Sequence, residues 1–393
     1  MRTLTGRGRT IVVVGVTGAG AGWLIGEPAI TAVALLLVLL PAIGAITVRR
    51  SRFALGSARM VTPTRITVGA VADVELIVEN GSRFTTGLLL LEDTVPDSLG
   101  SSARVLLDRI PPDAQRSQHY PVEGLERGRA RIGPLSVVIT DPFGMASVTR
   151  SFASTSSVMV VPEIVSLGSG GASMTPGGHN DTMFRALAAR GDDDLLPREH
   201  RPGDDIRHIH WRATARLGEL MVRREEQAWH AAVTIVLDDR VSAHHGTGTS
   251  STFEWAVSAA ASIAMHFLRQ GWRVVVLTTS GRVLAQAQYA SSAGIDHLMQ
   301  AFADIRPIDA VMVPDLGLDS DGATAVVTVL GRLTNEDAQV MGRPVGGFAG
   351  CLLLDPGPDA HLRSLGWRVT CWHRSTPVAE AWRRIAVPVG VSP

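Results

Sequence analysis

The charged segment at residues 198–226 holds the densest set of side chains able to do chemistry. Its sequence, REHRPGDDIRHIHWRATARLGELMVRREE, carries seven arginines, six carboxylates and three histidines around Trp211, with a predicted turn at Pro202-Gly203. Arginine forks suit carboxylates, and arginine and tryptophan are enriched at interface hot spots. We therefore expect one subset of the segment to be buried in ion pairs and another to dock a protein partner. The candidates for these two roles are Arg198, Arg201, Gly203, Asp204, Asp205, Arg207, Trp211, Arg212 and Arg216.

Two other kinds of site are disfavoured in this segment. Its six acids nearly cancel its seven arginines, so binding to nucleic acid would release few counterions. The whole chain, with 37 basic and 37 acidic residues, has a formal net charge of zero and lacks a steering field. His208 and His210 would share one face of a strand, but tightly held metals need three or four ligands. We expect neither nucleic acid nor zinc or iron to bind here.

The sequence offers no recognisable catalytic set. It has no Gly-x-Ser-x-Gly turn, and the glycine-rich run at 168–178 lacks the Lys-Ser/Thr of a phosphate-binding loop. Cys351 and Cys371 lie in apolar runs, which predicts small buried residues in a reducing compartment. His244 and His245 lie in a Gly/Ser/Thr-rich loop, where we expect them to be solvated. We expect no catalytic residue and no cofactor.

Residues 1–50 predict a transmembrane hairpin with spans at about 10–25 and 29–48. The second span has about the ~20 residues needed to cross a bilayer. The first is short and glycine-rich like a signal-peptide core, but a second apolar run follows after only Gly26-Glu27-Pro28, which favours a hairpin. Arginines flank both outer ends, at positions 2, 7 and 9 and at 49, 50 and 52. The positive-inside rule then places both termini, and everything after residue 50, on the cytoplasmic side of the plasma membrane.

The remaining chain predicts two folded domains. Residues 56–161 contain short alternating runs separated by turn signals, typical of an all-β sandwich. A linker is predicted at 162–184, and the segment at 185–230 contains the charged motif. From 231 to 393, buried apolar runs alternate with amphipathic stretches, which predicts a doubly wound, Rossmann-like parallel sheet. The run at 282–288 predicts one antiparallel edge strand.

The chain resembles the bacterial membrane proteins of the domain-of-unknown-function-58 family. The motifs that carry the resemblance are Arg198, Arg201-Pro202-Gly203-Asp204-Asp205-Ile206-Arg207, Trp211-Arg212-Ala213-Thr214-Ala215-Arg216 and Leu220, with support from Arg127-Gly128 and Asp141-Pro142-Phe143-Gly144. The resemblance implies a final domain similar to a von Willebrand factor A domain. It also implies a MoxR-type AAA ATPase as partner, often with a transglutaminase-like membrane protein, and no established catalytic activity.

A von Willebrand factor A domain can hold Mg²⁺ through an Asp-x-Ser-x-Ser sequence after its first strand. The corresponding residues here are Asp238-Asp239-Arg240-Val241-Ser242, in which Asp238 and Ser242 fit but Arg240 replaces the first serine. Two like unit charges at about 4 Å repel by ~4 kcal/mol at an effective dielectric constant of about 20, so a fixed cation there would oppose a divalent ion strongly. The acid expected after a later strand is also missing from Leu330-Gly331-Arg332. We therefore expect a degenerate metal site, with Asp238 or Asp239 paired to an arginine.

These features favour a non-catalytic, membrane-anchored adaptor that binds protein partners, with a MoxR-type AAA ATPase first among them. The alternative is a metal-dependent ligand-binding domain, and an uncharacterised hydrolase comes third. A metal titration separates the first two.

Overall fold

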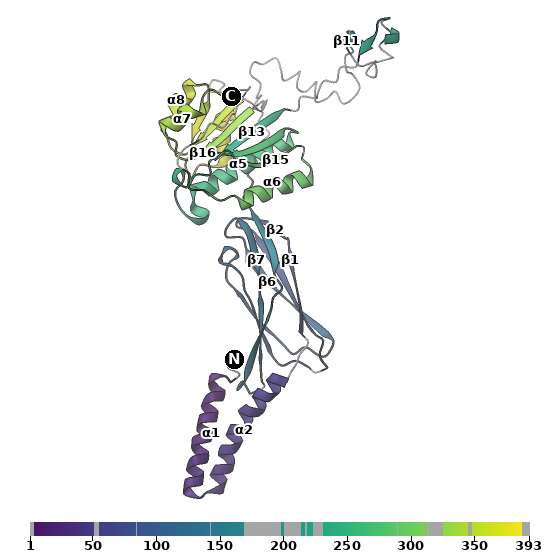
Figure 1. Cartoon of the computed structure of the whole chain (residues 1–393), viewed down its shortest axis with the longest axis vertical. Coiled ribbons are helices and arrows are strands. Elements are labelled where there is room, and N and C mark those ends of the chain that lie inside the picture. The colour runs from purple at the N-terminus through teal and green to yellow at the C-terminus, as the bar shows by residue number, and fades with distance from the viewer. Residues whose placement is uncertain are drawn as a thin grey trace. The chain divides into compact units, whose positions relative to one another are not determined.

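The protein forms two compact units, Met1–Pro162 and Glu163–Pro393. They are taken from a computed structural model and shown in Figure 1. The residues that the structure describes are 4–50, 55–83, 85–141, 143–168, 198–199, 214–216, 218–222, 231–288, 290–310, 313, 325–344 and 348–386.

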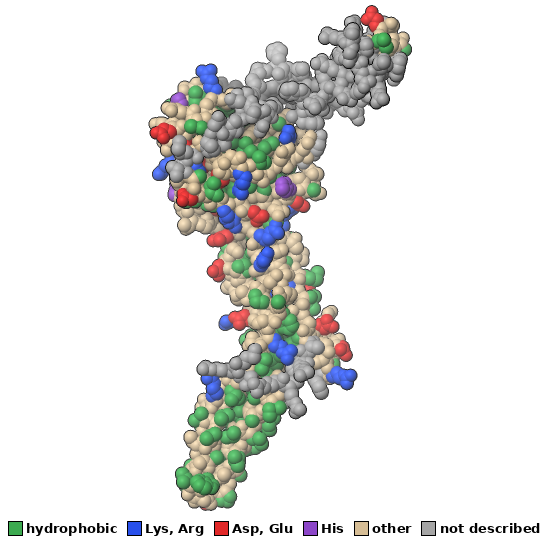
Figure 2. All heavy atoms as spheres, in the orientation of Figure 1, with side chains coloured by type: hydrophobic (Ala, Val, Ile, Leu, Met, Phe, Trp, Pro, Cys, Tyr) green, Lys and Arg blue, Asp and Glu red, His purple; other side chains and the backbone are tan. Residues whose placement is uncertain are grey.

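The first unit begins with two antiparallel helices, α1 (Gly6–Ile25) and α2 (Pro28–Arg50). Both are long and apolar enough to cross a membrane, and they contain the predicted spans. They pack through a glycine face, because a Cβ atom at Gly15 would lie 2.7 Å from the Val38 side chain and one at Gly22 would lie 2.6 Å from the Thr31 hydroxyl. Hydrophobic side chains cover the outer surface of the hairpin (Figure 2).

A β-domain follows the hairpin within the same unit. Its strands are β1 (Leu55–Thr62), β2 (Arg65–Thr67), β3 (Val71–Asn80), β4 (Leu89–Asp93), β5 (Ala103–Leu107), β6 (Ala114–Glu123), β7 (Gly128–Ile132), β8 (Leu135–Thr140), β9 (Ser147–Phe152) and β10 (Ser156–Val161). They form three sheets, ordered β1-β3-β6, β2-β10-β7 and β5-β4-β8-β9. The first of these sheets is antiparallel throughout, as is the third.

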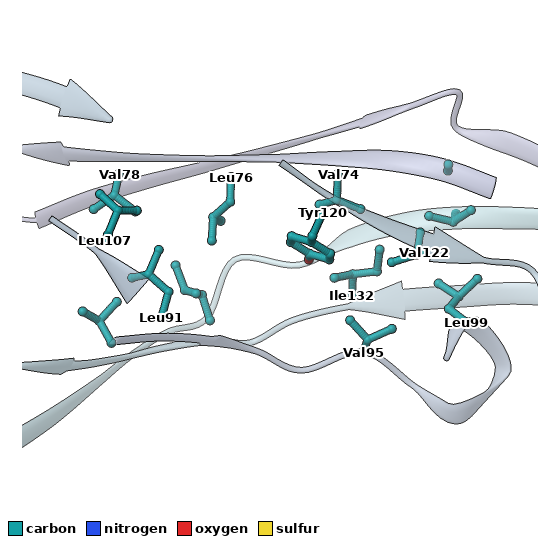
Figure 3. Packing of buried hydrophobic residues seen from close by; sticks show 14 of the residues in the cluster. Val74, Leu76, Val78, Leu91, Val95, Leu99, Leu107, Tyr120, Val122 and Ile132 are labelled. Carbon is teal, nitrogen blue, oxygen red and sulfur yellow. The ribbon is translucent and has the colours of Figure 1, made fainter. Parts of the chain in front are cut away.

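One apolar core joins these sheets. On β3, alternate residues are buried, so Val74, Leu76 and Val78 all point to one side, as a period of two requires. Figure 3 shows them opposite Leu91 and Ile132 from the other sheets. The predicted all-β domain is therefore present, built from short alternating strands.

The second unit contains a six-stranded mixed sheet. Its strands are β13 (Ala232–Leu237), β14 (Arg273–Thr278), β15 (Val283–Ala287), β16 (Ala325–Leu330), β17 (Phe348–Leu353) and β18 (Arg368–Cys371). The order is β15-β14-β13-β16-β17-β18, parallel except for the antiparallel edge strand β15. Its helices are α5 (Thr252–Arg269), α6 (Ser292–Asp304), α7 (Asn335–Met341), α8 (Asp359–Ser364) and α9 (Val378–Ala386). Fully buried strands and amphipathic helices explain why periodicity predicted this architecture correctly.

A two-residue ladder lies within the charged segment. It pairs β11 (Arg198–Glu199) with β12 (Met221–Val222) in antiparallel register, Arg198 opposite Val222 and Glu199 opposite Met221. Residues 200–213 and 217 lie outside the described residues, as does most of the predicted linker.

Candidate functional site at the carboxyl ends of the sheet

The second unit has its topological switch point between β13 and β16. From β13 the chain continues to β14 and β15 on one side, whereas β16 leads to β17 and β18 on the other. Open α/β sheets bind ligands in the crevice that this reversal creates beyond the carboxyl ends of the strands. Asp238, Asp239 and Arg240 follow β13 directly, so the chain places three charged, buried side chains at this position.

Arg240 forms a two-point ion pair with Asp238. Its Nε donates to Asp238 Oδ1 and its Nη2 to Asp238 Oδ2, both at 2.9 Å. Asp238 also accepts the backbone amides of Arg240 at 3.2 Å and of Gly331 at 3.1 Å. Both carboxylate oxygens are therefore occupied by N–H donors of the protein itself. The pairing of Asp238 with an arginine, expected from the sequence, is present.

A second carboxylate, Asp337 in the first turn of α7, faces the same guanidinium. Arg240 Nη1 donates to Asp337 Oδ2 at 3.1 Å, and Val313 N donates to Asp337 Oδ1 at 3.0 Å. Thr334 and Asp337 form a capping box at the start of α7. Burial opposes ionisation of Asp337, but the amides of Val313 and Thr334, the Thr334 hydroxyl and the charge of Arg240 together hold its pKa below the ordinary value.

Asp239 is satisfied by neutral groups. Thr279 Oγ1, just beyond β14, lies 3.0 Å from both Asp238 Oδ1 and Asp239 Oδ1. Ser280 donates to Asp239 through its backbone amide at 3.2 Å and its hydroxyl at 2.9 Å. We name Asp238, Asp239, Arg240, Thr279 and Asp337 the switch-point cluster.

The loop after β13 corrects one expectation about the histidines. His245 is exposed, but His244 is partly buried, and its Nε2–H donates to Asp238 O at 3.0 Å. Burial lowers the pKa of His244 despite the nearby Asp238 charge, which favours the neutral ring. His244 therefore belongs to the support of the cluster, where the composition of the loop predicted a solvated side chain.

Ser242, the other degenerate metal candidate, turns away from Asp238. It is exposed, and its hydroxyl donates to Ala310 O at 3.2 Å. The backbone of the 305–310 segment runs beside it, with Val241 N donating to Ile308 O at 2.8 Å. Asp238 and Ser242 are close in sequence, but the structure gives them different partners.

The docking candidates of the charged segment are described only in part. Arg198 lies on β11, and Arg216 is an exposed residue of a short helical turn at 214–216. The remaining candidates fall outside the described residues, namely Arg201, Gly203, Asp204, Asp205, Arg207, Trp211 and Arg212. Their predicted division into paired and docking subsets stays a prediction.

Cys351 follows the sequence prediction of a small buried residue, and Cys371 follows it only in part. Cys351 is fully buried on β17, where burial raises the pKa of its thiol to about 12, so it is a poor nucleophile. Cys371 is half-buried, and burial raises its pKa too. Within the described ranges, no group of three or more His, Cys, Asp or Glu side chains is arranged to hold a metal ion.

Sequence reasoning missed Asp337 and Thr279 as members of the switch-point cluster, and Gly331 as a backbone donor to Asp238. The Thr334-x-x-Asp337 spacing signals a helix start, but nothing in it indicates a partner 97 positions away. Position 331 requires a glycine for steric reasons, since a side chain there would collide with the Ala243 carbonyl. Pairing of Arg240 to two acids could have been suggested only once the strand order was known.

The comparisons with known proteins add a family match. The model of a family described as "Protein of unknown function DUF58" matches residues 197–335, less than half of the chain. No curated protein matches the sequence significantly.

Solved structures give only distant likenesses. The CARDB domain of the PF1109 protein from Pyrococcus furiosus, in complex with di-metal ions, is 14% identical, with a TM-score of 0.22 over 28% of this chain and 90% of that chain. A β-glucosidase mutant from Listeria innocua is 11% identical, with a TM-score of 0.19 over 30% of this chain and 17% of that chain. Similarity this low says nothing about ligands or activity.

The carboxylates of the cluster are all hydrogen-bonded by donors of the protein itself. Arg240 supplies a positive charge between Asp238 and Asp337, and the oxygen atoms of Asp239 accept from Thr279 or Ser280. Buried charges are tolerated when paired and hydrogen-bonded in this way. What the arrangement can do chemically is hold the ends of β13, β14 and β16 together with α7.

Proposed function

We propose that this protein is a non-catalytic, membrane-anchored adaptor that binds a protein partner through its α/β unit. The observation that carries the proposal is the guanidinium of Arg240 between Asp238 and Asp337, at the position where folds of this kind bind ligands. Since the donors and acceptors there are satisfied by one another, the unit is better suited to present a surface than to activate a substrate.

The α1–α2 hairpin supports the anchoring part of the proposal. Both helices have the length and composition of membrane spans, and Arg7 and Arg9 stand at the outer end of α1. With the positive-inside rule, this favours a plasma-membrane protein whose termini and folded domains are cytoplasmic. A reporter that is active only outside the cytoplasm, fused after Pro393, should therefore stay silent; activity would overturn this topology.

The rim of the switch-point cluster is a suitable docking surface. Val241 and Ile308 are exposed apolar residues joined by a backbone hydrogen bond. The amide of Arg332 donates to Ala243 O, two residues from Val241, and the Arg332 side chain is 70% exposed. The buried core of a protein interface is more apolar than its rim, and arginine is enriched at interface hot spots. The family resemblance makes a MoxR-type AAA ATPase the partner to test first, with a transglutaminase-like membrane protein second.

The test is binding of the full-length protein in detergent to a purified MoxR-type ATPase from the same organism. Val241→Asp and Arg332→Ala should each weaken binding several-fold with little change in melting temperature. Arg269→Ala is the matched control, because Arg269 is an exposed arginine at the end of α5, away from the cluster rim. Arg216→Ala tests the charged segment in the same assay. Wild-type protein that fails to bind, or binding that no rim variant changes, contradicts the respective part of the proposal.

The rival function, metal-dependent ligand binding, is tested on the same sample. Calorimetric titration of the wild-type protein with Mn²⁺ should give no saturable heat that depends on Asp238. The Asp238→Ala variant, titrated in the same way, is the comparison that shows this dependence. Saturable binding that requires Asp238 would replace the adaptor proposal with the rival, since it would mean that the metal displaces Arg240 from Asp238.

A further inference from the structure

The turn between β8 and β9 is fastened to the first turn of α1. Thr5, the N-cap of α1, donates from its backbone amide to Met145 O at 2.9 Å and from its hydroxyl to Gly144 O at 2.7 Å. Leu4 forms an isolated antiparallel bridge with Ala146. Gly8 allows this approach, because a side chain there would collide with the Met145 carbonyl. The β-domain therefore contacts one particular end of the hairpin.

The same turn also touches α2. A Cβ atom at Gly44 would lie 3.1 Å from Asp141 Oδ2, so the helix backbone approaches this carboxylate closely. Asp141 is buried and fixes the turn, accepting Ala146 N at 2.5 Å and Phe143 N at 3.1 Å. Because the contacts lie at Gly8 and Gly44, the turn is level with the part of the hairpin that carries Arg7 and Arg9.

Phe143 lies in this turn and is 64% exposed. An exposed large apolar side chain on a turn held by several hydrogen bonds has no role in the core of the domain. Its position beside the arginine-bearing end of two apolar helices corresponds to the boundary between headgroups and acyl chains of a bilayer. Phe143 is therefore positioned to enter a lipid surface if the hairpin spans one.

The outer face of the four-stranded sheet changes character with distance from this turn. Leu90 on β4 pairs with Leu106 on β5 and with Val138 on β8, three residues before Asp141, or about 10 Å along the strand. Leu106 is 60% exposed. The next outward row, about 7 Å farther away, is the exposed ion pair between Glu92 and Arg104 at 2.8 Å. On this face the apolar row thus lies nearer the hairpin than the ion pair does, and the paired residues Thr140 and Ser147 lie between it and the turn.

We propose that the hairpin-side end of the β-domain is a second membrane contact, with Phe143 in the lipid interface and the Leu90–Leu106 row directly above it. The occupant is the lipid of the membrane that the hairpin crosses, and the inference thus rests on the proposed anchoring. Apolar area entering the interface adds favourable free energy to that anchor. The contact also fixes which end of the β-domain faces the lipid.

The experiment uses full-length protein reconstituted into vesicles of phosphatidylcholine with a minor share of phosphatidylglycerol. Single cysteines replace Phe143, Leu106 or Val71 in a Cys371→Ala background and carry an environment-sensitive fluorophore; Cys351 is buried and stays unlabelled. Val71 is the matched control, an exposed apolar residue at the other end of β3, opposite Glu123. Lipids with brominated acyl chains should remove most of the fluorescence at position 143, a smaller part at 106 and none at 71.

A fourth label, at Leu36 on the outer surface of α2, separates the two proposals. Quenching at 36 but not at 143 overturns the second contact and leaves the anchor intact. No quenching at 36 overturns the anchor itself. If the emission of the fluorophore at position 143 is blue-shifted but brominated lipid does not quench it, the side chain contacts a protein surface and not lipid. This result also overturns the proposal.

Discussion

Each unit of this protein buries a two-point arginine–carboxylate pair, and the two pairs differ in where the fold places them. In the β-domain, Arg59 binds Asp93 through Nη2 at 2.6 Å and Nε at 2.9 Å, both side chains being almost fully buried. In the α/β unit, Arg240 binds Asp238 with the same fork. The chemistry of the two pairs is thus the same.

The two ion pairs connect different parts of their domains. Arg59 also donates to Ile132 O and Ser154 O at 3.1 Å, and Tyr120 donates to Asp93, so this pair ties strands of all three sheets in the middle of the domain. Burial, together with the Asp93 hydrogen bond, raises the pKa of Tyr120. The Arg240 pair stands beyond the ends of its strands, at the edge where ligands bind in related architectures. A buried ion pair is therefore informative about function only through its place in the topology.

Arg240→Ala should cause the largest loss in the free energy of unfolding. This change leaves both Asp238 and Asp337 buried without their cation. Removing one partner of a buried pair costs about 3–5 kcal/mol, and two stranded carboxylates should place the loss at the upper end. Urea denaturation of the α/β unit, followed by tryptophan fluorescence, measures it. A loss below about 1 kcal/mol would show that the pair contributes no more than an exposed one.

Arg59→Ala should cause the second-largest loss in the free energy of unfolding. One carboxylate loses its cation, but Tyr120 continues to donate to Asp93, so we expect a loss near ~3 kcal/mol. The loss should appear in the β-domain, as followed by hydrogen exchange of β1, β4 and β6, and leave the exchange of β13 unchanged. A larger cost for Arg59→Ala than for Arg240→Ala would reverse the ranking.

Lowering the pH should weaken the stabilising contribution of the Arg240 cluster by protonating Asp337. Its native pKa is depressed, so the unfolded chain, with a carboxyl pKa of about 3.9, binds protons first. The stabilising contribution is complete above that pH and disappears as the pH falls through the native pKa. Thermal midpoints recorded on acidification should therefore fall less steeply for Asp337→Asn than for the wild type. Asp355→Asn, which removes an exposed carboxylate, is the control and should retain the wild-type slope.

The smallest effects should come from exposed pairs. Arg104 with Glu92 in the β-domain and Arg332 with Asp355 in the α/β unit are both solvated. Alanine at either arginine should change the free energy of unfolding by about 0–1 kcal/mol, because water screens such pairs. Urea denaturation of both variants, measured together with Arg59→Ala, compares these losses in unfolding free energy with that of a buried pair. A cost above about 2 kcal/mol at either position would mean that exposure does not separate the two classes.

The sequence predicted element types well wherever one face or both faces of a strand are buried. Two of the apolar runs predicted after residue 231 correspond to β13 and β14, and the antiparallel edge strand predicted at 282–288 corresponds to β15. Helices were predictable as well, since α5 and α6 correspond to two of the amphipathic stretches expected between the apolar runs. These features are local, with periods of 2 or 3.6 residues, so a short window of the sequence is enough to recognise them.

Contacts between distant residues could not be predicted in the same way. The pairs Arg59–Asp93 and Arg240–Asp337 are separated by 34 and 97 positions, and no pattern in the chain connects their members. Asp238–Arg240 was predictable because the fork spans only two positions. The charged segment was the most conspicuous feature of the sequence, yet its docking role stays a prediction, because most of its residues lie outside the described part.

The β11–β12 ladder gives this segment a property of its own. Because Glu199 lies opposite Met221, the two ends of the intervening stretch, 22 positions apart in the sequence, pair with each other. For a flexible loop, doubling the length raises the entropic cost of closure by only about 0.6 kcal/mol. A stretch tied in this way can gain or lose residues while its base stays intact.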